Sequence, residues 1–157
     1  MDNAAVKLKQ SQSQSRSTTY LLAQTTNIIR NSWIDPALKE HGLTSLQYTV
    51  LSVIRRYSGL SSAELSRHFF VTPQTMGPIL TQLDKRGLIL REPNTENRRL
   101  LAISLTAKGK HLQETCKHVI ADIEHEIFGE LDADTLQIFR DTLQRVYRRA
   151  QDSHRPG

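Results

Sequence analysis

The chain has 157 residues, of which 38% are hydrophobic, enough for one compact domain with a hydrophobic core. Its formal net charge of +5 favours an anionic partner such as nucleic acid or a membrane surface. The single cysteine, Cys116, excludes an internal disulfide and a cysteine zinc cage, so a reducing cytoplasm is the expected compartment. Because no apolar run has the length of a membrane span or of a signal segment, we expect no membrane partner.

Residues 1–17 are polar and rich in Gln and Ser, so we expect a disordered tail. Residues 18–43 follow as a helical region in which Asp35-Pro36 predicts a break or bend and Gly42 predicts the end. The apolar stripe of this region is typical of one helix face and consists of Leu21, Leu22, Thr25, Ile28, Ile29, Ser32 and Trp33.

Helix starts are clearly marked in the next region, residues 44–105. A hydroxyl residue followed three positions later by Glu or Gln is typical of a capping box, in which each side chain binds the other residue's backbone N–H group. Thr44 with Gln47 and Ser61 with Glu64 both fit this pattern. The sequence therefore predicts two helices that begin at these caps, the second of them short.

A third helix is predicted directly after the short one. Thr72 is a preferred N-cap, and Pro73 suits the first helical position, where its missing N–H is not needed. Pro78 lies inside this helix and removes a backbone hydrogen bond, so a kinked or tightened first turn is expected. Gly87 marks the end of the helix, and its one-sided apolar positions are Met76, Ile79, Leu80 and Leu83.

The first turn of this third helix is polar, and a short helix followed closely by another is typical of a helix-turn-helix. Because such a helix enters the major groove with its N-terminal residues, we expect contacts with bases and phosphates there. Gln can pair with adenine, Thr can reach a phosphate or a thymine methyl, and glycine allows close backbone approach. The alternative is that these residues only cap helices. The candidate DNA contacts are Ser62, Thr72, Gln74, Thr75 and Gly77.

Residues 88–90 and 101–105 are expected to form two short strands joined by a turn that starts at Pro93. Arg98 and Arg99 follow this turn. An arginine on a thin loop can enter the narrow minor groove of A·T-rich DNA, whereas the alternative is a solvated charged loop. The sequence thus predicts a winged helix-turn-helix, a mainly α fold with a small β-hairpin wing.

In combination, these motifs resemble the MarR family of bacterial transcription regulators. The resemblance extends over roughly residues 18–150. It implies that Arg99 enters the minor groove and that Arg98 lies near phosphate. Two positions depart from the family pattern: Asn97 stands where an Asp is usual, and Gly77-Pro78 stand where polar or basic residues are frequent. The resemblance rests on Leu83-Asp84-Lys85-Arg86-Gly87-Leu88, Asn97-Arg98-Arg99 and Leu105-Thr106-Ala107-Lys108-Gly109.

Residues 106–151 carry two further helices with apolar stripes, and residues 152–157 are expected to fray. These stripes, together with that of residues 18–43, exceed what one small winged domain can cover. We therefore expect the terminal helices to pair with those of a second copy in a two-fold homodimer. Such a dimer presents two recognition helices to a near-palindromic operator, with half-sites about one helical turn apart.

The resemblance also implies a pocket for a small-molecule effector, often an aromatic or phenolic acid, between the dimer helices and the DNA-binding domain. Rings and basic groups suit such a ligand, although Trp33 and Tyr48 can equally belong to the core. The expected function is a DNA-binding repressor, released from its operator by the effector. The candidate effector contacts are Asn27, Arg30, Trp33, His41 and Tyr48.

Other functions remain as alternatives. His111, His118 and His125 recur every seven residues, which leaves a metal sensor open, although a solvated ridge is the expectation. Cys116 falls on an apolar stripe, so we expect a buried, inert thiol rather than an oxidant sensor. An architectural DNA-binding protein without inducer is a further rival. Because no nucleophile elbow, phosphate loop or zinc-protease motif occurs, we expect no enzyme and no cofactor.

Overall fold

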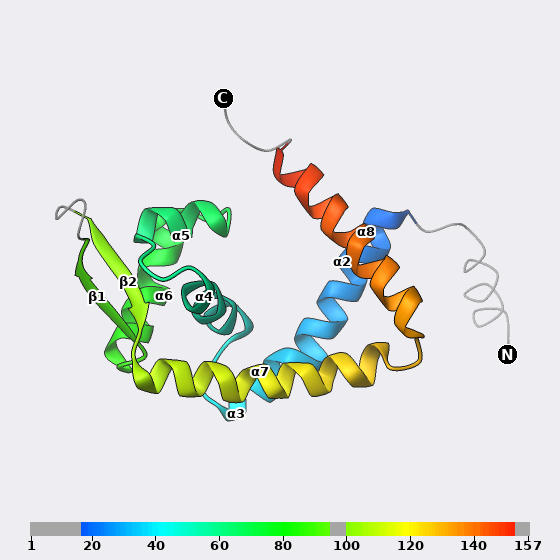
Figure 1. Ribbon diagram of the computed structural model, residues 1–157, viewed down its shortest axis with the longest axis horizontal. Coiled ribbons are helices and arrows are strands. Elements are labelled where there is room, and N and C mark those ends of the chain that lie inside the picture. Colours follow the sequence, from blue (N-terminus) through cyan, green and yellow to red (C-terminus); the bar gives the residue numbers. More distant parts are fainter. Residues whose placement is uncertain (1–16, 95–99, 153–157) are drawn as a thin grey trace, which may run out of the picture. The chain divides into compact units, whose positions relative to one another are not determined.

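The computed structural model describes residues 17–94 and 100–152. The fold is mainly helical with one two-stranded antiparallel hairpin, so the predicted fold class is confirmed (Figure 1). Residues up to Cys116 form one compact unit, and residues from Lys117 form a second. In chain order the elements are α2 (Thr18–Ile28), the π-helical η2 (Ile29–Ile34), α3 (Asp35–Glu40), α4 (Ser45–Arg56), α5 (Ser62–His68), α6 (Pro73–Lys85), β1 (Ile89–Pro93), β2 (Leu101–Leu105), α7 (Ala107–Phe128) and α8 (Ala133–Asp152).

Both predicted capping boxes are confirmed. At the start of α4, the Gln47 N–H donates to Thr44 Oγ1 over 3.2 Å, and the Thr44 N–H donates to Gln47 Oε1 over 3.1 Å. At the start of α5, the Ser61 N–H donates to Glu64 Oε2 over 2.8 Å, and the Glu64 N–H donates to Ser61 Oγ over 3.3 Å. Each box satisfies two N–H groups that the helix itself leaves unpaired, which fixes where the helix begins.

The capping box of Ser61 and Glu64 predicts that the stability of the protein depends on pH. Hydrogen bonds from the Ser61 backbone and hydroxyl, aided by the nearby Arg67 charge, hold the pKa of Glu64 below its ordinary value of 4.5. A lowered folded-state pKa means that this stabilisation is complete above pH 4.5 and is lost as the pH falls through the folded-state pKa. Glu64→Gln should therefore flatten the fall in melting temperature below pH 4.5, measured by circular dichroism. An unchanged acid profile would contradict this role.

Three helices end in the same Schellman hydrogen-bond pair. At the end of α3, the Gly42 N–H donates to Lys39 O over 2.9 Å; at the end of α6, the Gly87 N–H donates to Asp84 O over 2.8 Å. These glycines have φ of 68° and 66°, as the sequence predicted for helix ends. At the end of α5, Phe70 takes the equivalent place with φ 52°. For a side chain larger than glycine, this conformation costs about 1–2 kcal/mol.

The core of the first unit lies between the helices of the helix-turn-helix, the hairpin and the start of α7. It consists of the close-packed, apolar side chains that the predicted stripes supply. The contact of Gln47 Nε2 with Gln82 Oε1, 2.8 Å long, joins α4 to α6 beside these side chains. The buried members are Leu38, Leu43, Val50, Leu51, Ile54, Leu65, Met76, Leu80, Leu83, Leu88, Ile89, Ile103, Leu105 and Cys116.

The helix is not broken at Asp35-Pro36, where the sequence predicted a break or bend, and the irregularity lies directly upstream. The helix continues through Pro36, which lies in the first turn of α3, and the irregularity is the upstream π-helical turn η2. There the Asp35 N–H donates to Arg30 O, five residues earlier. Because a proline ring clashes with the carbonyl four residues before it and offers no N–H, the wider π pairing relieves the conflict without ending the helix.

The hairpin is longer than the sequence suggested. β1 extends to Pro93, which pairs with Leu101, rather than ending at residue 90. Proline is tolerated there because it stands at the strand end of a two-stranded sheet, where its missing N–H leaves no ladder bond broken. On its other side β2 forms a bridge to Leu60, with the Ile103 N–H donating to Leu60 O over 3.0 Å. The wing is thereby attached to the segment that leads into α5.

Helix α7 begins in close contact with the end of α6. The Thr106 hydroxyl donates to Gly87 O over 2.7 Å and accepts the Gly109 N–H over 2.9 Å. The Thr106 N–H donates to Leu88 O over 3.1 Å. A Cβ at Gly109 would lie 1.9 Å from the Leu88 carbonyl oxygen, so the backbones approach too closely for any other residue. This contact explains the Leu-Thr-x-x-Gly run.

The second unit contains the rest of α7 and α8. Asp132 caps α8, since Oδ1 accepts the Thr135 N–H over 2.8 Å. The rings of Phe128 and Phe139 lie 6.0 Å apart between centroids. Asp152, which was expected to fray, is the last residue of α8. None of the described helices is long and apolar enough to cross a membrane.

Candidate nucleic-acid interface

The first turn of α6 exposes the polar side chains that the sequence singled out. Thr72 Oγ1 accepts the Thr75 N–H over 3.2 Å, and the two hydroxyls lie 3.1 Å apart. Thr72, Gln74 and Thr75 are all exposed, so capping leaves them accessible to a partner. Unpaired N–H groups and the helix dipole make this end of α6 attractive to phosphate. Ser62, in contrast, is half-buried in the first turn of α5, and its carbonyl accepts the Ser66 hydroxyl over 2.9 Å.

Helix α6 is continuous across Gly77-Pro78. Its first turn is tightened, because the N–H groups of Thr75 and Met76 both donate to Thr72 O over 3.0 Å. The Thr81 hydroxyl donates to Gly77 O over 2.9 Å. A Cβ at Gly77 would meet nothing within 4 Å, so the glycine faces open space and leaves the helix backbone accessible. The close approach of DNA to this backbone stays a prediction.

The hairpin is linked to α6 by an ion pair that the sequence did not reveal. Arg91 Nε in β1 lies 3.1 Å from Asp84 Oδ2 in α6. The predicted wing contacts Asn97, Arg98 and Arg99 belong to the β1–β2 connection and lie outside the described residues. Their roles therefore stay predictions, while the Arg91–Asp84 pair shows what holds the base of the wing against α6.

Arg86 joins the far end of α6 to the rest of the unit, which the sequence also did not show. Its Nη1 donates to Gly42 O over 2.6 Å and its Nη2 to His41 O over 3.4 Å. Lys108 Nζ in α7 donates to Arg86 O over 2.9 Å. The end of α3, the end of α6 and the start of α7 are thus bound to one residue. The Lys85-Arg86-Gly87 run of the sequence indicates basic residues at the end of α6, but it does not indicate which groups they bind.

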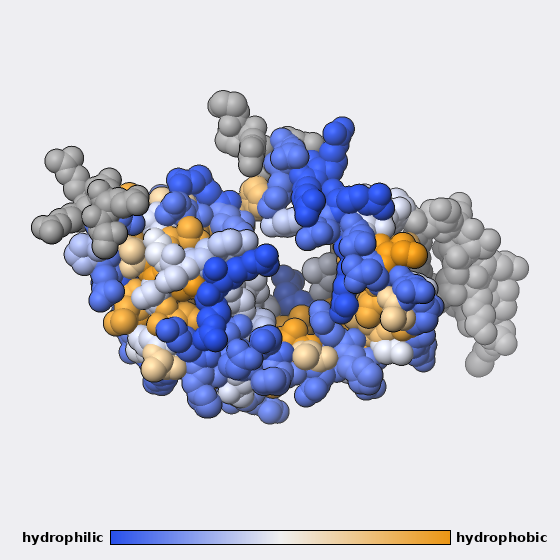
Figure 2. Space-filling view, in the orientation of Figure 1, coloured by the Kyte–Doolittle hydropathy of each residue, from blue (hydrophilic) through white to orange (hydrophobic). Residues whose placement is uncertain are grey.

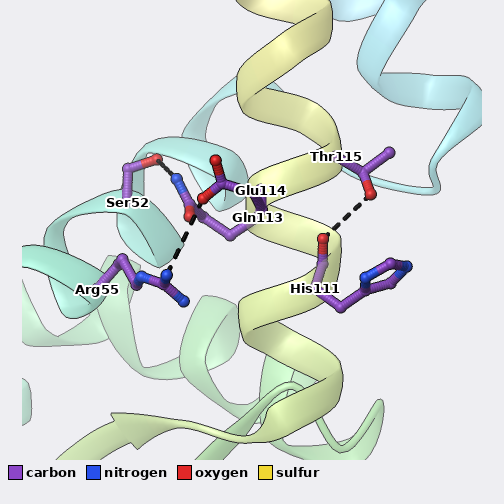
Figure 3. Close-up of polar contacts among 6 residues, drawn as sticks. All are labelled: Ser52, Arg55, His111, Gln113, Glu114 and Thr115. Carbon is purple, nitrogen blue, oxygen red and sulfur yellow. Dashed lines mark hydrogen bonds and ion pairs between the residues drawn. The ribbon is translucent and has the colours of Figure 1, made fainter.

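A second polar contact fixes the first half of α7 to α4 (Figure 3). The buried Gln113 donates through Nε2 to Ser52 Oγ over 3.4 Å, and Arg55 Nη2 lies 4.0 Å from Glu114 Oε2. Gln113 Oε1 is buried with no hydrogen-bond partner among the described residues. These contacts therefore link α7 to α4 within the first unit.

Comparison with known proteins gives this surface a context. The MarR family profile matches residues 43–101, which include α4, α5, α6 and β1. The HTH-type transcriptional repressor Rv2887 of Mycobacterium tuberculosis is 32% identical over 127 residues, which cover 81% of this chain and 91% of that protein. The chain belongs to the MarR family. It is a transcription regulator of the DNA-binding helix-turn-helix type, as the resemblance predicted.

Two crystal structures of Rv2887 are similar to this MarR-family chain. In the complex with DNA, Rv2887 is 30% identical to this chain, with a TM-score of 0.72, and the match covers 84% of this chain and 98% of the Rv2887 chain. In the complex with salicylic acid, Rv2887 is 30% identical to this chain, with a TM-score of 0.69, and the match covers 85% of this chain and 98% of the Rv2887 chain. The relatives of this MarR chain are transcriptional regulators, which are not enzymes.

The five residues predicted to bind an effector in this MarR regulator lie on α2, on η2, at the end of α3 and on α4 of the first unit. Asn27 and Arg30 come together, because Arg30 Nη2 lies 3.5 Å from Asn27 Oδ1 and donates to it. Trp33 in η2 is 39% exposed, which argues against a core role. His41 ends α3, and Tyr48 lies in α4; both are half-buried. A ring, that of Trp33, and a cation, that of Arg30, are therefore accessible on η2.

The sensing alternatives gain no support in this MarR chain. His111, His118 and His125 are exposed, and within residues 17–94 and 100–152 no cluster of three or more His, Cys, Asp or Glu could hold a metal ion. Cys116 is buried as predicted, and burial raises the pKa of its thiol, against a smaller opposing effect of Arg86. A protonated, inaccessible thiol reacts slowly with oxidants.

Proposed function

We propose that two copies of this MarR-family regulator form a two-fold dimer that represses transcription from a near-palindromic operator and is released by a small aromatic acid. The observation that carries the DNA-binding part is the exposed first turn of α6, with Thr72, Gln74 and Thr75 around a helix N-terminus. The net charge of +5 supports a polyanionic partner. Rv2887 has been crystallised with DNA and with salicylic acid, which supports both ligand classes.

The dimer is supported by the terminal helices. No residue of α2 or α8 is buried within the single chain. Large hydrophobic side chains are nevertheless exposed there, including Leu21, Ile28, Leu143 and Val146, and hydrophobic residues interrupt the hydrophilic surface in Figure 2. Apolar stripes of this extent mark an interface between subunits. In a two-fold arrangement the same helices of both copies cover each other.

Effector release follows from linkage. An effector that binds one arrangement of the two recognition helices better than another lowers DNA affinity by the same factor as DNA lowers effector affinity. Arg86 supplies a physical connection, because it binds the carbonyls of His41 and Gly42 at one end and belongs to the end of α6 at the other. A carboxylate that binds Arg30 would act on the helical segment η2, which leads into α3.

Base recognition by α6 is tested by a pair of substitutions. Gln74→Ala should change the preferred base at one operator position and weaken specific binding by about 1–3 kcal/mol, because it removes a two-point contact with adenine. Lys85→Ala, at the other end of the same helix, should weaken all DNA sequences about equally, because a lysine contacts phosphate. Selection of bound sequences from a random pool, followed by titration, measures both effects.

Retention of both affinity and preference in Gln74→Ala would contradict the assignment of Gln74. Release of the selected operator by salicylate or a related acid separates the proposed repressor from an architectural DNA-binding protein, which has no inducer.

A further inference from the structure

The exposed face of α6 carries a row of side chains that runs along most of the helix. At about 100° per residue, the positions four, seven and eleven residues after Gln74 all lie within about 40° of it around the helix axis. The buried Met76, Leu80 and Leu83 lie on the opposite side. The row consists of the exposed residues Gln74, Pro78, Thr81 and Lys85. A duplex that contacts Gln74 in the first turn of α6 therefore faces Pro78 on the next turn.

Pro78 is the apolar member of this row. Helix α6 continues through it, although a proline has no N–H to donate to the carbonyl four residues earlier. Its ring is exposed and follows Gly77, which has no side chain to shield it. On either side of it in the row, Gln74 and Thr81 carry groups that form hydrogen bonds. The row therefore presents an apolar surface between two polar side chains.

The base edges of the major groove offer one good apolar partner for such a surface, the C5 methyl of thymine. The other groups that the base edges present there are hydrogen-bond donors and acceptors, and a proline side chain can pair with none of them. A base amino or carbonyl group covered by the ring would lose its water without gaining a partner, which is unfavourable. An apolar contact at this place therefore favours thymine over the other bases.

We infer that Pro78 is a specificity-determining residue, whose ring packs against a thymine C5 methyl near the base that Gln74 contacts. With a rise of about 1.5 Å per residue, Pro78 lies about 6 Å from Gln74 along the helix axis, and base pairs are about 3.4 Å apart. The thymine is therefore expected about one or two base pairs from the position that Gln74 reads. This inference rests on the proposed function, because it needs α6 in the major groove, and it adds one residue to the candidate DNA contacts.

Pro78→Ala and Pro78→Val separate the ring contact from the effect of the proline on the backbone. Both variants regain the N–H that proline lacks, so a change in helix geometry is common to them, and neither should melt at a lower temperature than wild type. Valine keeps an apolar side chain of similar size, so Pro78→Val should keep the preference for thymine. Pro78→Ala should accept other bases at that position and bind the operator about fourfold more weakly, which corresponds to the loss of one buried methyl contact. Selection from a random pool, followed by titration, measures both effects, and the position read by Gln74 should stay unchanged.

Removal of the methyl from the DNA provides the reciprocal test. Deoxyuridine in place of that thymidine should weaken binding by wild type and by Pro78→Val about fourfold, and it should leave binding by Pro78→Ala unchanged, because alanine no longer covers the methyl. A selected operator without thymine at that place, wild-type binding that does not depend on the methyl, or equal behaviour of the two variants overturns the inference and leaves the proposed function intact. A wild-type protein that selects no DNA sequence overturns the proposed function itself.

Discussion

Leu143→Glu is expected to convert the proposed dimer into monomers and to weaken operator binding by about a hundredfold or more. Leu143 belongs to the exposed apolar stripe of α8, on a helix that buries no residue within its own chain. In a two-fold dimer the substitution buries one carboxylate at each of two symmetry-related places of the interface, and each buried, unpaired charge costs several kcal/mol. The loss in DNA binding is large because a dimer gains about two to four orders of magnitude from engaging both half-sites at once.

Gln144→Glu is the matched control for this experiment. It adds the same charge one residue along α8, about 100° around the helix and off the apolar stripe. Sedimentation of both variants, followed by titration with the selected operator, should show a monomer for Leu143→Glu and a dimer for Gln144→Glu. A dimeric Leu143→Glu protein with wild-type affinity would exclude α8 from the interface.

Gly109→Ala is expected to destabilise the fold by about 3 kcal/mol, the upper range for forcing a methyl into a packed site. The added Cβ would lie 1.9 Å from Leu88 O, a backbone atom that is itself held by the Thr106 N–H. Neither backbone can yield without breaking the contact between α7 and the end of α6. Denaturant unfolding of the wild type and the variant measures the change.

Gly77→Ala provides the opposite case within the same chain. A Cβ there meets nothing within 4 Å outside the neighbouring residues, and only crowding against Pro78 opposes the better helix propensity of alanine, so stability should change by less than about 1 kcal/mol. Equal stability changes in the two alanine variants would show that the approach of Leu88 to Gly109 does not limit the fold.

Features that depend on neighbouring residues were predictable from the sequence. The capping boxes at Thr44 and Ser61 and the glycine end of α6 involve groups within a few residues of each other, so local chemistry specifies them. The exposed first turn of α6 followed in the same way, because the cap of Thr72 and the one-sided apolar spacing orient the helix. Local capping and one-sided apolar spacing together predict the helix-turn-helix and its candidate DNA surface.

Features that depend on distant partners were not predictable. The sequence marks Gly109 within a motif, but its constraint comes from Leu88, 21 residues earlier in the numbering. The sequence predicted an irregularity at Pro36 itself, whereas the helix accommodates this proline upstream, in the π-helical turn η2. Phe70 contradicts the rule that glycine occupies such helix ends, so no local pattern announces it.

The proposed function depends most on two copies holding paired α6 helices against one duplex. The mass of the protein bound to its selected operator, measured by analytical ultracentrifugation, tests this directly. We predict the mass of one duplex plus two chains of 17.9 kDa each, with two half-sites about one helical turn apart in the selected sequence. A complex of one chain per duplex, or a selected site with a single half-site, would contradict it.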